Sequence, residues 1–169
     1  NDLHFGVVDI YLMQKKYALA KEYVKEHNVY GCDVLLAKCE LALKQYDDAL
    51  FLIIGTGVGG AVFLNGELLK PKRYSGFEVG HMVIDTEGPN CNCGRNGCFE
   101  VHTSIKRLKR KIQKEFNLPD IDGKKIVEFI IKNKENEKLN KIIDTYLEYL
   151  SLGIANLINI FEPEAISIG

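Results

Sequence analysis

One histidine and three cysteines lie close together in the middle of the chain, with an acidic residue on either side. The segment Glu-Val-Gly-His occupies positions 78–81, Cys-Asn-Cys-Gly-Arg-Asn-Gly-Cys occupies 91–98, and an acid follows at 100. Zinc prefers four nitrogen or sulfur ligands in a tetrahedron, and one His with three Cys is a common structural set. The alternative is three unrelated buried thiols beside a core histidine. The spacing favours a closed, structural zinc site whose ligands are His81, Cys91, Cys93 and Cys98.

A glycine-rich segment precedes this loop. The sequence Gly-Thr-Gly-Val-Gly-Gly at 55–60 follows the apolar run 49–54. A backbone without Cβ atoms can approach a phosphate, and consecutive amides can form an anion-binding nest. The segment is neither a Walker sequence nor the fingerprint that opens a dinucleotide-binding helix. Taken alone, it suits a tight hairpin as well as a phosphate site, but the neighbouring metal-type loop favours phosphate. The residues of this expected nucleotide site are Gly55, Thr56, Gly57, Gly59 and Gly60.

The bulk composition is ordinary for a soluble globular protein. The 169 residues are 46% hydrophobic and 27% charged, with a net charge of −1. This charge gives no electrostatic reason to expect a nucleic acid or an anionic membrane as partner. No apolar run approaches the roughly 20 residues that span a bilayer. Five cysteines, three of them in the ligand cluster, suit a reducing cytoplasm better than a disulfide framework.

The apolar patterns predict an α/β protein. The run at 49–54 has the length and composition of a strand that is covered on both faces. Asn65-Gly66 between two apolar runs predicts a hairpin turn. Long stretches with apolar residues at helical spacing predict helices, above all at 137–161. The expected strands are 4–12, 49–54, 61–64, 67–69 and 165–168, and the expected helices are 15–27, 35–43, 104–116, 123–133 and 137–161.

Basic residues cluster at 106–111, which contains three lysines and two arginines. Such a cluster is compatible with nucleic-acid binding. The near-neutral charge of the whole chain favours the other interpretation, in which these residues form the solvated face of an amphipathic helix.

Together these motifs resemble the ROK family of bacterial sugar kinases and sugar-responsive repressors. The shared pattern is a strand, Gly-Thr-Gly-x-Gly-Gly, a hairpin, Glu-x-Gly-His, Cys-x-Cys-Gly-x-x-Gly-Cys-x-Glu, and Pro-Glu-x-Ile-x-Ile-Gly at 163–169. It covers most of the chain, from about residue 49 to the last residue. The resemblance implies one lobe of an actin-like ATPase (ribonuclease H-like) fold, with a mixed sheet and a zinc-binding loop.

The resemblance also implies roles for individual residues. Glu78 and Glu100 match carboxylates that hydrogen-bond sugar hydroxyls, and His81 matches a ligand that also lies against the sugar. The turn at 55–60 matches the loop that approaches the nucleotide phosphates. Ionised carboxylates accept strong, directional hydrogen bonds from hydroxyls. A zinc ion nearby would hold both carboxylates on one rigid loop.

Two positions depart from the family pattern. Family kinases carry the catalytic base as the Asp of Glu-Asn-Asp-Ala-Asn, upstream of the glycine turn. The best match in this chain is Asp33, which lacks the flanking asparagines, and a helix N-cap is the alternative role for it. Phe77 is the second departure, because the family usually has a small residue before the sugar-binding Glu.

The function implied is that of an ATP-dependent, glucokinase-like hexose kinase that phosphorylates the sugar 6-hydroxyl. Its cofactors would be ATP with Mg²⁺, and structural Zn²⁺; its partners would be a hexose and a second copy in a homodimer. We expect residues 1–169 to be one lobe of a larger two-lobed protein, without the N-terminal phosphate-motif lobe and the C-terminal end. The isolated chain would therefore be a poor catalyst.

Two other functions remain open. One is a sugar-sensing transcriptional repressor of the same family, whose DNA-binding domain would lie outside this sequence. The other is a free-standing zinc module, although the long helical region at 137–161 argues against it, because small zinc modules do not need such a core.

Overall fold

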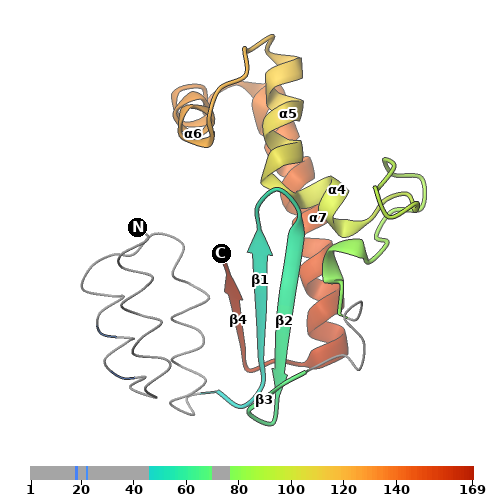
Figure 1. Cartoon of the computed structure of the whole chain (residues 1–169). Coiled ribbons are helices and arrows are strands. Elements are labelled where there is room, and N and C mark those ends of the chain that lie inside the picture. Colours follow the sequence, from blue (N-terminus) through green and yellow to red (C-terminus); the bar gives the residue numbers. More distant parts are fainter. Residues whose placement is uncertain (1–17, 19–21, 23–45, 70–76) are drawn as a thin grey trace. The chain divides into compact units, whose positions relative to one another are not determined.

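The computed structural model describes residues 18, 22, 46–69 and 77–169. The expected strand at 4–12, the expected helix at 35–43 and Asp33 lie outside these residues, and the expected helix at 15–27 is described only at two helical positions, 18 and 22. None of the described helices combines the length and the hydropathy needed to span a bilayer. The elements (Figure 1) are β1 (Ala49–Ile54), β2 (Val58–Leu64), β3 (Glu67–Leu68), η1 (Val79–His81), α4 (Phe99–Thr103), α5 (Ile105–Glu115), α6 (Gly123–Lys132), α7 (Glu137–Phe161) and β4 (Ala165–Ile168).

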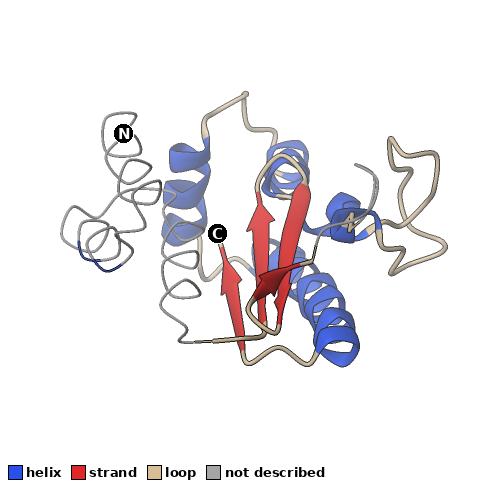
Figure 2. Ribbon diagram, turned by 60° about the horizontal axis from the view of Figure 1, so that its bottom comes forward, coloured by secondary structure: helices blue, strands red, loops and turns tan. Residues whose placement is uncertain are grey.

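The four strands form one mixed sheet in the order β3-β2-β1-β4 (Figure 2). β1 pairs in parallel with β4, so that Ala49 lies opposite Ala165, and β2 pairs in antiparallel fashion with β3. This agrees with the mixed sheet that the sequence predicts. Glu164 fixes the start of β4, because its carboxylate Oε2 accepts hydrogen bonds from the amides of Asp47 and Asp48 at 2.7 and 3.2 Å.

Local sequence accounts for the strands and their turn. The first four residues of β1 are buried, as expected for a continuous apolar strand. The rings of Phe51 and Phe63 meet edge to face with centroids 5.5 Å apart. Asn65 and Gly66 both adopt positive φ, 54° and 74°, which is the conformation that a primed hairpin turn requires. The predicted Asn-Gly hairpin is therefore confirmed.

The chain divides into two compact units, which are described separately. The first comprises residues 1–53, 60–77 and 161–169, and the second comprises 54–59 and 78–160. The described part of the first unit is mainly the sheet. The second unit contains the cysteine loop and the helices, and its core is formed by Ile112, Ile126, Leu139 and Ile142 with neighbouring apolar side chains.

The helices agree with the predicted segments, with three differences. α4 is not among the predicted elements, and it separates the cysteine loop from α5. Ser104 is both the C-cap residue of α4, where its amide donates to Glu100 O at 3.0 Å, and the N-cap residue of α5, where its side chain makes no capping hydrogen bond. Leu147 and Ile158 belong to the apolar stripe of α7, yet they are 48% and 41% exposed. The apolar stripe is therefore wider than the surface that the described residues cover.

Candidate metal centre and adjoining carboxylate

The loop between η1 and α4 is held in shape by backbone hydrogen bonds at its base. Phe99 N donates to Met82 O at 2.7 Å, and Ile84 N donates to Gly97 O at 2.9 Å. Two isolated antiparallel bridges, at Val83–Cys98 and Asn90–Asn96, tie the two arms of the loop together. The loop therefore returns on itself, so residues near its start face those near its end.

This return brings the four predicted ligands together. The ligand atoms of His81, Cys91, Cys93 and Cys98 all lie within 4.8 Å of one another. The Sγ atoms of Cys93 and Cys98 are 3.5 Å apart, and Cys91 Sγ is 3.5 Å from His81 Nδ1. Ligands about 2.3 Å from a tetrahedral ion lie about 3.8 Å from each other, so these separations suit one metal ion. The four side chains would hold such an ion with no position left for a water ligand.

The thiols differ in how readily they ionise. Hydrogen bonds from the backbone and then the side chain of Arg95 lower the pKa of Cys93 to about 6. Burial raises the pKa of Cys98 to about 12. Cys93 is exposed, whereas Cys91 and Cys98 are buried. Without a cation beside it Cys98 therefore stays a neutral thiol, and a metal ion bound by the cluster would stabilise its thiolate.

Glu100 lies directly beside this cluster. It is the second residue of α4, and its Oε1 is 3.4 Å from Cys91 Sγ and 3.8 Å from His81 Nδ1. Its other oxygen faces the glycine turn, since a Cβ added at Gly57 would lie only 2.7 Å from Oε2. A side chain at position 57 would require the Glu100 carboxylate to shift. The structure thus places one acid, the metal-type ligands and the glycine turn next to one another.

The glycine turn is also packed against the ends of other elements in the second unit. Lys106 N donates to Gly55 O at 3.3 Å. A Cβ at Gly80 would overlap the carbonyl oxygen of Val58, which explains the glycine of the Glu-x-Gly-His segment. The turn is shorter than predicted, because β2 already begins at Val58. Gly59 and Gly60 are therefore strand residues, and the amide of Gly55 donates within the turn to Gly57 O at 2.9 Å.

Two other predicted site residues are exposed to solvent, and the neighbouring Phe77 has an unusual backbone conformation. Glu78 precedes η1 and is exposed, and no hydrogen bond or ion pair involves its side chain among the described residues. Thr56 is exposed in the turn. Phe77, just before the acid, adopts a φ of 64°, and its ring packs against Phe161 with centroids 5.5 Å apart. The left-handed backbone there gives a physical reason for a small residue at this position.

A second polar cluster supports the loop from the helical side, and the sequence analysis missed it. The hydroxyl of Tyr149 donates to Asp85 Oδ2 at 2.9 Å. The ring of His102 stacks on Tyr149 with centroids 3.8 Å apart, and its Nε2 is 3.6 Å from Asp85 Oδ2. No motif links these residues, because Tyr149 lies 64 positions beyond Asp85. The one feature of the sequence that could have indicated this cluster is the histidine two positions after Glu100, on the same short helix.

Comparison with known proteins gives a consistent result. The family model described as "ROK family" matches residues 33–169. The chain is 37% identical over 130 residues to a xylose repressor of Bacillus subtilis. This match covers 74% of the present chain and 32% of the repressor. It is 32% identical over 139 residues to a glucokinase of Thermotoga maritima, covering 75% of this chain and 43% of that protein. The chain therefore spans less than half the length of these relatives.

The solved structures give the same picture. A ROK hexokinase from Thermus thermophilus matches with a TM-score of 0.63 and 29% identity, over 73% of this chain and 41% of that one. The similarity to this solved protein and the mixed sheet agree with the α/β fold class expected.

Proposed function

Since the chain belongs to the ROK family, we propose that it forms the sugar-binding part of an ATP-dependent hexose kinase, with Glu78, His81 and Glu100 binding the sugar. The observation that carries this proposal is the position of Glu100. Its carboxylate is held beside Cys91 and against the glycine turn. A sugar bound there would lie next to a segment suited to nucleotide phosphates.

We propose that the ion held by His81 and the three cysteines is structural zinc. A closed set of four ligands activates no water, so the ion would shape the loop. Cys91 as a thiolate has no proton to donate, which leaves Glu100 Oε1 free to accept from a sugar hydroxyl. With Nδ1 of His81 directed at the cysteines, its Nε2 is available for a second hydroxyl.

The roles of the reacting groups are proposed from family membership. Asp33 is proposed as the general base that accepts the proton of the 6-hydroxyl. Mg²⁺ with ATP would supply the phosphoryl group and charge stabilisation. The amides of Gly55, Thr56, Gly57, Gly59 and Gly60 are the proposed phosphate contacts, with rearrangement of the Gly55 amide, which now bonds within the turn. We further propose a cytoplasmic homodimer and a second lobe beyond this chain.

A sugar-responsive repressor is the second candidate. The similarity to a xylose repressor is somewhat higher in identity than that to the glucokinase. The absence of the asparagines around Asp33 also supports a non-catalytic member. A repressor would use the same metal loop and the same carboxylates to sense the sugar.

Sugar binding and ADP release separate these candidates. Titration calorimetry of the full-length protein with glucose and with xylose should show binding of one of them. Glu100→Gln should weaken it by about 1.5–3 kcal/mol, as for a hydrogen bond to a charged group. Unchanged affinity in both Glu100→Gln and Glu78→Gln would exclude the two acids from the site.

Hexose-stimulated ADP release then decides between kinase and repressor. If Asp33 is the base, Asp33→Asn should lower kcat by about 10²–10⁴ with a smaller change in KM. If Asp33 is a helix cap, Asn should cap it about as well and turnover should persist. A wild-type protein that binds the sugar but releases no ADP would support the repressor.

A further inference from the structure

The second unit contains a cavity of about 460 Å³ on the helical side of the cysteine loop. Val101 of α4, Leu108 of α5, and Ile142 and Tyr146 of α7 provide an apolar wall. Val101 and Ile142 are each only 6% exposed, and Ile142 belongs to the core of the second unit. An apolar wall of this kind suits a ligand with an aromatic or aliphatic body.

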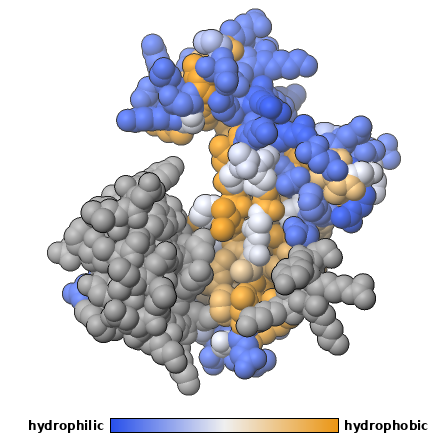
Figure 3. Space-filling model, viewed as in Figure 1, coloured by the Kyte–Doolittle hydropathy of each residue, from blue (hydrophilic) through white to orange (hydrophobic). Residues whose placement is uncertain are grey.

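Four cations also line this cavity. They all belong to α5, and no carboxylate lines the cavity. Within the part of the chain that the structure describes, none of the four forms an ion pair. Figure 3 shows the surface around α5 as mostly hydrophilic. The four cations are Arg107, Arg110, Lys111 and Lys114.

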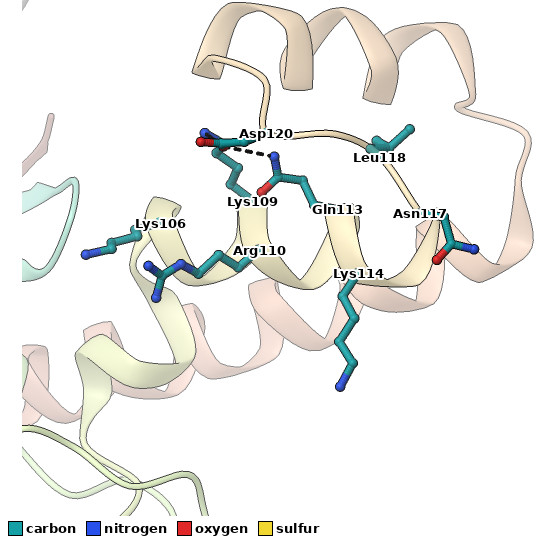
Figure 4. A pocket seen from close by; sticks show the side chains of 8 residues that line it. All are labelled: Lys106, Lys109, Arg110, Gln113, Lys114, Asn117, Leu118 and Asp120. Carbon is teal, nitrogen blue, oxygen red and sulfur yellow. Dashed lines mark hydrogen bonds and ion pairs between the residues drawn. The ribbon is translucent and has the colours of Figure 1, made fainter.

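A neighbouring hollow on α5 lacks this combination. It is larger, about 740 Å³, and it is lined by charged and amide side chains with Leu118 as its one apolar residue (Figure 4). Its carboxylate, Asp120, is already paired with Lys109 at 2.9 Å and lies 3.3 Å from the amide of Gln113. This hollow fits the solvated face predicted for the basic cluster.

One buried polar group in the wall of the smaller cavity has no hydrogen-bond partner among the described residues. The side chain of His102 is 8% exposed, and its Nε2, although 3.6 Å from Asp85 Oδ2, makes no hydrogen bond among the described residues. The ring of Tyr146, whose pKa burial raises, lines the same wall. Buried polar groups in native proteins are normally satisfied, so unpartnered ones beside a cavity are a sign of a missing ligand or water.

We propose that this cavity, between α4, α5 and α7, binds a small organic anion: a phosphate or carboxylate group carried on an aromatic or aliphatic body. Guanidinium and ammonium groups of α5 pair with the oxyanion, and arginine does so in bidentate fashion. The body packs on Val101, Ile142 and the ring of Tyr146.

Such a ligand would act on the sugar site through α4. This step rests on the sugar-binding role proposed above, whereas the cavity itself does not. Val101 and His102 line the cavity, and Glu100 precedes them on the same five-residue helix. A ligand that shifts this helix changes the position of the Glu100 carboxylate. By linkage, the sugar and the anion must then alter each other's affinity by the same factor.

Phenyl phosphate is the probe, because it joins a phosphate to an apolar ring. Calorimetric titration into the full-length, metal-loaded protein should show saturable binding that weakens with added salt. Inorganic phosphate, which has no body to pack, should bind at least about tenfold more weakly. Equal affinity for the two compounds would overturn the proposal.

A pair of double variants provides the matched test. Arg107→Ala with Lys111→Ala removes two cavity cations, and it should weaken phenyl phosphate binding about tenfold or more. Lys124→Ala with Lys125→Ala makes the same charge change on α6, away from the cavity, and it should keep the wild-type affinity. An equal loss in both would mean general charge attraction only and would overturn the proposal.

The coupling between the cavity and the sugar site is measured in a separate experiment. Hexose affinity, measured with and without saturating phenyl phosphate, should change, and the Arg107→Ala, Lys111→Ala variant should lose this change. Equal hexose affinity under both conditions would overturn the coupling. A protein that binds phenyl phosphate but no hexose would refute the proposed sugar function while supporting the cavity.

Discussion

At the scale of single residues, the contacts of Asp85 are the main support of the loop outside the ligand set. Its carboxylate faces both Tyr149 and His102, and its amide donates to Gly97 O at 3.3 Å. Side chain and backbone of one residue thus join the cysteine loop to α4 and α7. Changes at these positions should act on loop stability without touching a metal ligand.

Tyr149→Phe isolates the hydrogen bond to Asp85. Removing the hydroxyl should lower the free energy of unfolding by about 1 kcal/mol, the usual net worth of such a bond. Tyr146→Phe is the matched control on the same helix, because that hydroxyl makes no hydrogen bond within the described residues. Urea denaturation of both variants measures the difference. Equal losses of unfolding free energy in the two variants would show that the hydrogen bond from Tyr149 to Asp85 does not stabilise the fold.

His102 should make stability depend on pH. Burial lowers its pKa below the ordinary 6.5, against the opposing effect of Asp85, and Lys111 lowers it further. The unfolded state therefore binds more protons as the pH falls through about 6.5, and the folded state loses stability there. His102→Gln should remove this part of the decline. Urea midpoints measured from about pH 7.5 to about 5.5 test it; parallel curves for wild type and variant would contradict the expectation.

At the scale of elements, two helices begin in different ways. Asp122 caps α6, since its Oδ1 accepts from Lys125 N at 2.8 Å. Ser104 occupies the same position before α5 without a side-chain bond. The residue types alone predict similar caps, and only the backbone of α4 explains why they differ.

Asp122→Ala should therefore destabilise the protein by about 1 kcal/mol, the typical cost of a lost N-cap. Ser104→Ala should change stability less, because no capping bond is lost. Thermal unfolding of the two variants in parallel gives the comparison. A larger loss for Ser104→Ala would show that this buried hydroxyl has a role that its hydrogen bonds do not reveal.

The sequence predicts long, regular elements well. α7 and β4 begin and end where apolar spacing places them, because many residues contribute to each pattern. η1 and α4 are too short to carry a period and depend on contacts across the loop. For the same reason the ligand spacing predicts four converging side chains, while the closeness of Glu100 to Cys91 and the part played by Tyr149 emerge only from the folded chain.

At the scale of the whole molecule, all four metal-type ligands belong to the second unit. If the cluster holds the proposed zinc, removing it should raise amide hydrogen exchange in residues 78–104, where the loop would lose its cross-link. β1 and β4, whose hydrogen bonds lie in the sheet, should keep their protection. Exchange with and without a chelator, followed by mass spectrometry, measures this.

Two results would contradict this expectation. The first is an equal rise of exchange in β1 and β4. The second is a response to chelator in Cys98→Ser, the variant that lacks the most deeply buried ligand of the set, because it should already show the metal-free pattern.

The pairing of β1 with β4 also has a consequence during synthesis. Asp48 and Glu164, which bond to each other beside these strands, are 116 residues apart. At a translation rate of roughly 5–20 residues per second, β1 waits on the order of ten seconds for its partner. An apolar strand with a free edge is a template for pairing with other chains. The nascent protein is therefore most prone to aggregate while α5, α6 and α7 are being made, and conditions that slow elongation through these helices lengthen that interval.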